Sequence, residues 1–100
     1  MITDFFLGFI KIHILYHASK EPVFGLELIK ELSRHGYHIS PGTLYPILHR
    51  LLNEEYLTIK TKVVNGKVRK YYRITAKGKR ALKECAGKIH ELVEEVVEGR

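Results

Sequence analysis

The chain has 100 residues, of which 45% are hydrophobic and 28% charged, and its formal net charge is +6. This length supports one domain with a modest core and leaves little room for a deep catalytic cleft. No apolar run approaches the roughly 18 residues of a membrane span, and the start of the chain lacks the charged segment and cleavage site of a signal peptide. Cys85 is the only cysteine, so we expect a protein of the reducing cytoplasm that has no stabilising disulfide.

The first third of the chain predicts two helices. The first is expected to begin at an N-cap formed by Thr3 or Asp4 and to end near Ala18. Its apolar residues recur at helical spacing: Phe5, Phe6, Phe9, Ile10, Ile12 and Tyr16. The second is expected to begin near Phe24 and to stop before Gly36, a residue suited to the left-handed conformation at a helix end. Its predicted buried stripe consists of Leu26, Ile29 and Leu32, with Leu28 beside it.

A third helix is predicted to begin at Ser40, which can cap its free N–H groups, with Pro41 at the first helical position. Its expected inner stripe consists of Leu44, Leu48, Leu51 and Leu52. Its expected outward residues are Gly42, Thr43, Tyr45, Pro46, His49 and Arg50. Most of these can donate hydrogen bonds to phosphates or base edges, and no carboxylate precedes Glu54.

Two strands, Leu57–Val64 and Lys67–Ile74, are predicted to form a hairpin around Asn65-Gly66, because both residues accept the positive φ angles of a type I′ turn. The turn fixes the register of the strands. One face then carries an apolar patch of Leu57, Ile59, Tyr72 and Ile74. The other carries the cations Lys60, Lys62, Lys67, Arg69 and Arg73. Lys62 and Arg69 lie opposite each other, a repulsive pair that an external anion would relieve.

A last helix is expected to be capped by Thr75 and to end near Val97. Five of its residues follow heptad spacing: Leu82, Cys85, Ile89, Leu92 and Val96. About two heptads are too few for an isolated coiled coil but suffice for docking on another subunit or on the first helix. We expect Cys85 to be buried on this seam, with a redox role as the alternative.

The positive charge is concentrated in one segment. From Tyr56 to Lys83 there are ten lysines and arginines and no acidic residue, whereas the remainder of the chain holds seven cations and all 11 carboxylates. Such a distribution is expected of a protein that binds a polyanion. The alternative is a solvated basic face that only aids solubility.

Three helices followed by a basic hairpin predict an α+β, mostly α fold, a winged helix-turn-helix with an added C-terminal helix. In such folds the third helix enters the major groove of DNA and the hairpin, or wing, contacts the backbone. The run Ser-Pro-Gly-Thr-Leu-Tyr-Pro-Ile-Leu-His-Arg-Leu at 40–51 resembles the signature of the PadR family of transcriptional regulators. Residues 24–30, the run at 70–75 and Lys77-Gly78 resemble that family's second helix, wing and last-helix entry, so the resemblance spans about residues 5–83.

The resemblance implies a homodimeric regulator, usually a repressor, that binds a palindromic operator in double-stranded DNA. Residues 1–74 would form the DNA-binding domain and residues 75–100 the dimerisation helix; a small-molecule effector is a further possible partner. Expected DNA contacts are Ser40, the outward residues of the third helix and the five wing cations. The expected dimer interface consists of Phe5, Phe9, Leu82, Cys85, Ile89, Leu92 and Val96. Two features depart from the family: Leu26 replaces a common tyrosine, and the last helix lacks the aromatic residues with which compact members bind flat drugs.

Other functions find less support in the sequence. There is no phosphate-binding loop and no Ser/His/Asp or Cys/His arrangement, so we expect neither an enzyme nor a cofactor. His13 and His17 lie four residues apart, a spacing that can share a metal ion, but no carboxylate or cysteine completes a site in the sequence. We therefore interpret them as structural or interface residues and expect no metal site. A protein-interaction module on a winged-helix scaffold and an RNA-binding protein remain as alternatives.

Overall fold

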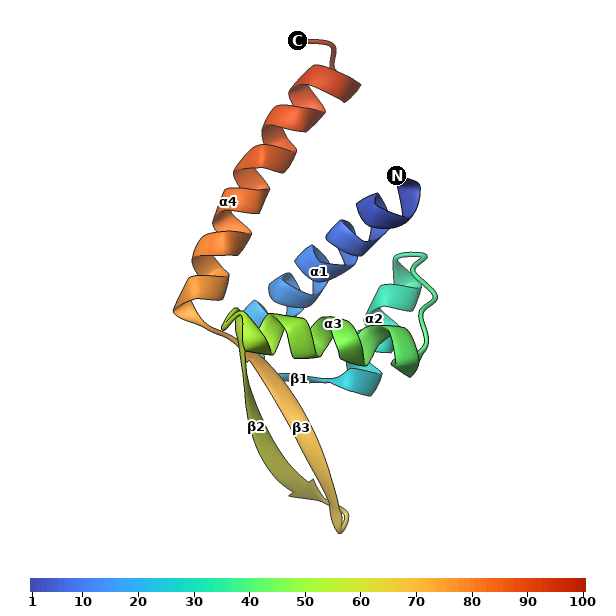
Figure 1. The fold of residues 1–100 in the computed structure, drawn as a ribbon, viewed down its shortest axis with the longest axis vertical. Coiled ribbons are helices and arrows are strands. Elements are labelled where there is room, and N and C mark those ends of the chain that lie inside the picture. Colours follow the sequence, from blue (N-terminus) through green and yellow to red (C-terminus); the bar gives the residue numbers. More distant parts are fainter.

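The computed structural model describes residues 1–100 as four helices and a three-stranded antiparallel sheet. The elements are, in order, α1 (Ile2–Lys20), β1 (Val23–Phe24), α2 (Gly25–Arg34), α3 (Pro41–Asn53), β2 (Leu57–Val64), β3 (Lys67–Ile74), α4 (Ala76–Leu92) and a π-helical turn, η1 (Val93–Val97). The molecule measures 55 × 28 × 20 Å, and α4 and the β2–β3 hairpin project from opposite ends of a body formed by α1, α2 and α3 (Figure 1). None of the helices has the length and apolar character needed to cross a lipid bilayer.

Two predicted helix caps are wrong in detail. Met1 is the N-cap of α1, so Thr3 and Asp4 lie within the first turn, where the Asp4 carboxylate complements the helix dipole. Ser40 does occupy the N-cap position of α3, but its side chain bonds no backbone N–H there. Its hydroxyl instead lies 3.4 Å from the Thr43 hydroxyl. The Thr43 and Leu44 N–H groups donate to the Ser40 carbonyl, so Gly42 supplies the free N–H at the start of α3.

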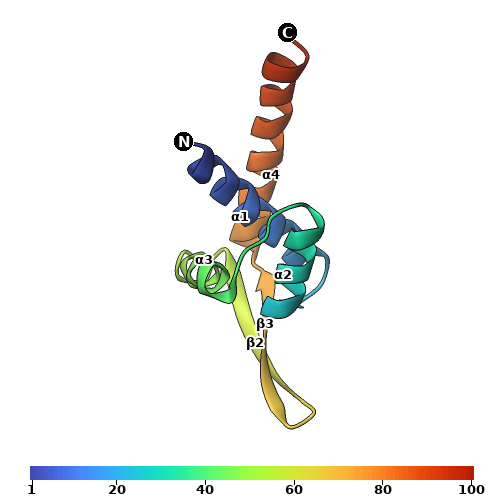
Figure 2. The same cartoon turned by 90° about the vertical axis from the view of Figure 1, so that its right-hand side faces the viewer.

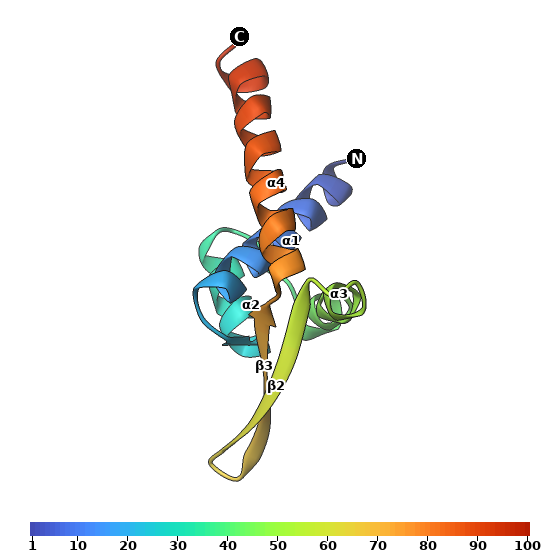
Figure 3. The same ribbon diagram turned by 90° about the vertical axis from the view of Figure 1, so that its left-hand side faces the viewer.

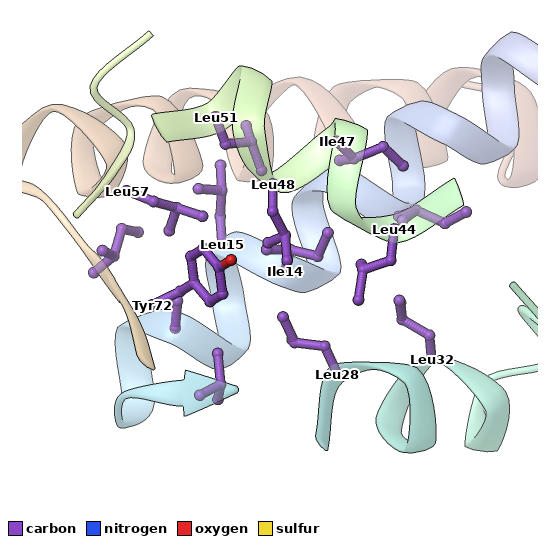
Figure 4. Close-up of a cluster of buried hydrophobic side chains, with 14 residues drawn as sticks. Ile14, Leu15, Leu28, Leu32, Leu44, Ile47, Leu48, Leu51, Leu57 and Tyr72 are labelled. Atoms are coloured by element: carbon purple, nitrogen blue, oxygen red, sulfur yellow. The ribbon is translucent and has the colours of Figure 1, made fainter. Parts of the chain in front are cut away.

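A core of 14 apolar residues lies where α1, α2, α3 and the base of the sheet meet (Figure 4). In α3 the prediction for Leu44, Leu48 and Leu51 is confirmed, with Ile47 buried and Leu52 only partly so. In α1 the buried face consists of Ile10, Ile14, Leu15 and Ala18, so Ile10 is the only one of the apolar residues at the predicted helical spacing that lies in the core. The helix is apolar on two sides, and its aromatic side faces away from the core.

Two residues expected in the core are exposed. Leu26 is 59% exposed, because α2 begins at Gly25 and its buried side chains, Leu28 and Leu32, lie further along the helix. Ile59 is 39% exposed, because the hairpin extends past the helical body and only its base is covered. The other members of the predicted apolar patch are buried: Leu57, Tyr72 and Ile74.

The predicted hairpin register is confirmed along its whole length, from Val64 opposite Lys67 to Leu57 opposite Ile74. Asn65 and Gly66 have φ angles of 52° and 75°, as a type I′ turn requires. A short third strand, β1, was not predicted; it pairs with β3 and places Phe24 opposite Tyr71.

The start of α4 is held against the end of α3. The Thr75 hydroxyl accepts a hydrogen bond from the Gly78 N–H (3.0 Å), which confirms the predicted cap, and donates one to the Glu55 carbonyl (2.6 Å). The Lys77 ammonium donates to the Glu54 carbonyl at 2.7 Å. Gly78 is buried in this junction, since a Cβ there would lie 2.6 Å from Ile74 and against the Tyr56 carbonyl. The direction of α4 is therefore fixed relative to α3 (Figure 2).

Candidate nucleic-acid interface

Helix α3 presents one face to the core and the other to solvent. Its apolar side is closed, with Leu44 and Leu48 fully buried. The residues predicted to read DNA are all exposed: Ser40, Gly42, Thr43, Tyr45, Pro46, His49 and Arg50. The helix continues through Pro46, which has no N–H to donate to the Gly42 carbonyl. The solvent face of α3 thus offers hydroxyl, imidazole and guanidinium donors and no carboxylate before Glu54.

Tyr45 is the member of this set with the most restricted position. It is 38% exposed, and its hydroxyl lies against Gly25 at the start of α2. A Cβ at position 25 would lie only 2.9 Å from the ring carbon that bears the hydroxyl. Gly25 therefore positions Tyr45, a role that no local pattern in the sequence indicates. Burial, and to a smaller extent Tyr45, raises the pKa of Tyr72 beneath it.

The cations of the wing lie on one face of the β2–β3 hairpin, as the register predicted. Four of them are exposed, whereas Arg69 is half-buried. The exposed ones are Lys60, Lys62, Lys67 and Arg73. No acidic residue lies in either strand, and the one carboxylate beside this face is that of Glu21, which lines the same groove as Lys60, Lys62 and Arg73.

Each of the two cations that oppose each other across the hairpin lies over an aromatic ring. The Arg69 guanidinium lies 4.4 Å from the centre of the Phe24 ring, and the Lys62 ammonium lies 5.6 Å from that of Tyr71. Phe24 and Tyr71 themselves pack edge to face at 5.6 Å. Cation–π attraction offsets part of the repulsion between Lys62 and Arg69 without an external anion. It also holds Arg69 beside the groove of about 350 Å³ that Tyr45 lines.

The surfaces predicted for dimerisation lie at the other end of the molecule. Helices α1 and α4 approach each other near the base of α4 and diverge towards the two chain termini (Figure 3). Where they meet, the side chains are partly buried: Phe9, Leu82, Cys85 and Ile89. Where they diverge, Phe5, Leu92 and Val96 are more than half exposed. The burial predicted for Cys85 is therefore only partial within one chain.

Known proteins resemble this chain over almost its full length. Residues 14–84 match the model of the "Transcriptional regulator PadR-like family". The chain is 45% identical over 99 residues to a Mycobacterium tuberculosis protein named transcriptional regulator Rv3488, which covers 99% of this chain and 92% of that relative. Among solved structures, a PadR family transcriptional regulator from Eggerthella lenta superposes with a TM-score of 0.85 at 34% identity, covering 98% of this chain and 87% of the other. A PadR-like transcriptional regulator from Bacillus cereus gives a TM-score of 0.75 at 36% identity, with coverages of 93% and 95%.

Proposed function

The chain belongs to the PadR-like family of transcriptional regulators, and from this premise we propose that it binds a palindromic operator in double-stranded DNA as a homodimer and represses transcription. Family membership confirms the resemblance on which this rests, the winged-helix fold, and the expectation that the chain is a regulator and not an enzyme. A DNA-binding regulator whose only thiol is Cys85 is also expected to work in the reducing cytoplasm.

The observation that supports DNA binding most directly is the solvent face of α3, which is free of carboxylates and lies beside the basic wing. Entry of α3 into the major groove would bring Thr43, His49 and Arg50 to base edges. The free N–H group at its start, that of Gly42, suits a phosphate. The wing cations would neutralise backbone phosphates on either side.

Dimerisation is supported by the exposed apolar surface of α1 and α4. Phe5, Leu92 and Val96 are exposed within one chain, and they belong to two helices, α1 and α4, that diverge towards the chain termini. A second copy that covers them would bury a surface of the kind that marks protein interfaces. In this proposal residues 1–74 bind DNA and residues 75–100 dimerise.

The junction at Thr75 and Lys77 gives the dimer a geometric role. Because α4 is bonded to the end of α3, the angle at which two α4 helices pack would set the distance between the two α3 helices. A two-fold dimer reads two half-sites when this distance matches one helical turn of DNA, about 34–36 Å.

An electrophoretic mobility shift with the DNA upstream of the protein's own gene tests the proposal. We expect a complex at low salt that weakens steeply as salt is added. Selection of bound sequences from a random pool should then recover two inverted half-sites about one helical turn apart. Absence of any complex at low salt would refute DNA binding. Recovery of a single half-site would refute the dimeric reading, and a reporter gene that is activated would refute repression.

A further inference from the structure

Three histidines come together on the side of the body that faces α4. His13 and His17 lie one turn apart on α1, and His35 is the C-cap of α2. Each offers one ring nitrogen, and these three nitrogens all lie within 4.8 Å of one another. The rings of His13 and His35 stack with their centres 4.6 Å apart. The sequence shows only His13 and His17 at a spacing that suits a shared metal ion, because His35 joins them only when α2 packs on α1.

One nitrogen of this cluster lacks a hydrogen-bond partner in the protein. His17 Nε2 is buried and makes no hydrogen bond. The Glu31 carboxylate is 4.0 Å away from it, too far for a hydrogen bond, and its other oxygen is bonded to Arg34 at 3.0 Å. Buried polar atoms are rarely left without a partner, and those that are call for an explanation such as an ion.

The cluster also favours the form of histidine that binds metals. Burial, and then the neighbouring His35 and His17, lower the pKa of His13. A lowered pKa keeps the imidazole neutral near pH 7, with a lone pair free for coordination. Three cations crowded together would repel one another, whereas three neutral rings can share one ion.

We propose that His13, His17 and His35 bind a divalent transition-metal ion of the zinc class. Imidazole nitrogen suits zinc, copper and nickel rather than calcium or magnesium, which prefer oxygen. Metal–nitrogen bonds of about 2.1 Å place tetrahedral ligand atoms about 3.4 Å apart, so the nitrogens must approach by at most about 1.4 Å. Side-chain rotation can supply this, since His35 is exposed and the other two are half-buried. Three histidines leave one position open for water or for Glu31.

The position of the site suggests what the ion would do. The histidines lie in a groove of about 630 Å³ between α1 and α4, whose other wall includes Lys79, Leu82 and Lys83. An ion there would join α1 to the end of α2 beneath the base of α4. If the proposed function holds, a change in the packing of α4 would alter the spacing of the two α3 helices, and the ion would act as a signal that changes operator affinity. By linkage, operator DNA would change metal affinity by the same factor.

Calorimetric titration of tag-free protein with Zn²⁺, and absorption spectroscopy with Co²⁺, test the site directly. We expect one ion per chain and visible Co²⁺ bands typical of nitrogen ligands. His35→Gln and His17→Gln should each weaken binding at least tenfold. His38→Gln is the matched control, because His38 lies three residues from His35 but its Nδ1 pairs with Ser33 at 3.0 Å outside the cluster. Failure of the wild-type protein to bind Zn²⁺, or equal binding by the folded His35→Gln variant, would overturn the site.

Operator binding measured with and without Zn²⁺ tests the regulatory role separately. We expect at least a fivefold change in wild-type affinity and none in His35→Gln. Zinc binding with unchanged operator affinity would overturn the regulatory role and leave the site. Zinc binding by a protein that binds no DNA would overturn the proposed function and again leave the site.

Discussion

The β2–β3 hairpin and the C-terminal half of α4 both project from the body, but their surfaces are opposite in kind. The hairpin carries six lysines and arginines and no acid, whereas the segment from Glu84 to Glu98 carries five carboxylates and one lysine. The exposed apolar side chains of α4 and η1 also gather there: Leu92, Val93, Val96 and Val97. An isolated hairpin and an isolated helix are each marginal in water. Because of their surfaces, the basic hairpin is suited to bind a polyanion and the apolar end of α4 is suited to pack on a protein surface.

The change of character occurs along α4 and η1. The first turns of α4 hold Lys77, Lys79 and Arg80 and continue the basic segment, its later turns hold equal numbers of lysines and glutamates, and the acidic residues gather at its end and in η1. Thr75 and Gly78 anchor the basic end to the body through Glu55, Tyr56 and Ile74. The helix thus connects the two surfaces as a rigid part, and the carboxylates at its far end would be repelled by DNA. Substitutions in the hairpin, at the end of α4 or at the junction between them test this difference.

The largest effect is expected at the apolar end. Leu92→Lys places a charge in the proposed interface, and we expect a monomer whose operator affinity falls by roughly 100-fold, because two linked half-sites become one. Sedimentation and a mobility shift measure the two quantities. Glu95→Lys places the same side chain at an exposed position of the same region, with a larger change of charge, and should leave the dimer intact. An unchanged Leu92→Lys dimer would remove this surface from the interface.

The next effect is expected at the junction. Gly78→Ala forces a methyl group against Ile74 and the Tyr56 carbonyl, so we expect the free energy of unfolding to fall by about 1–3 kcal/mol. Urea unfolding measures it. Gly87→Ala is the control on the same helix, because nothing lies within 4 Å of its Cβ, and it should be neutral or slightly stabilising. Equal stability of the two variants would mean that the junction is loose.

A specific loss is expected on α3. His49→Ala removes a donor from the solvent face and leaves the core untouched, so operator affinity should fall by about 1–3 kcal/mol while binding to random DNA changes little. Competition between operator and random DNA measures the ratio. If both affinities fell equally, His49 would contact phosphate rather than bases.

A smaller and general loss is expected on the wing. Lys67→Ala should weaken binding to every DNA sequence a few-fold and reduce the slope of log K against log salt by about 0.9, the value for one phosphate contact. Lys88→Ala, on the acidic half of α4, is the matched control and should change neither. A Lys67→Ala variant with the wild-type slope would place the tip of the hairpin away from the backbone.

The smallest effect is expected from acid at the histidine cluster. The pKa of His13 is lowered below its ordinary value of 6.5 by burial, His35 and His17. Between the two values the unfolded chain binds more protons, so stability falls as the pH is lowered through this window. The other groups that face the same groove are Lys79 and Lys83, with Glu31 beside His17. His13→Gln should flatten the stability profile below pH 6.5, and an unchanged profile would exclude His13 as its source.

Local signals in the sequence predicted most of the features that depend on residues close together in the chain. Asn65-Gly66 fixed the hairpin register, since the turn geometry depends on two adjacent residues. Thr75 was identified as a cap because its partner, Gly78, is three residues away. The two faces of α3 followed from helical periodicity. The predicted DNA-reading residues could be placed on the exposed face for the same reason.

Contacts between distant segments were decided only by the tertiary structure. Periodicity could not choose between the two apolar sides of α1, nor show that Leu26 and Ile59 lie beyond the edge of the core. Three contacts join elements that are separated in the chain: Tyr45 with Gly25, Arg69 with Phe24, and His35 with His13. The sequence by itself determined the family, the hairpin and the basic segment, because these depend on residue type and short spacing. The positions of Tyr45, Arg69 and the histidine cluster depend on how the helices and sheet pack, and packing is a property of the whole fold.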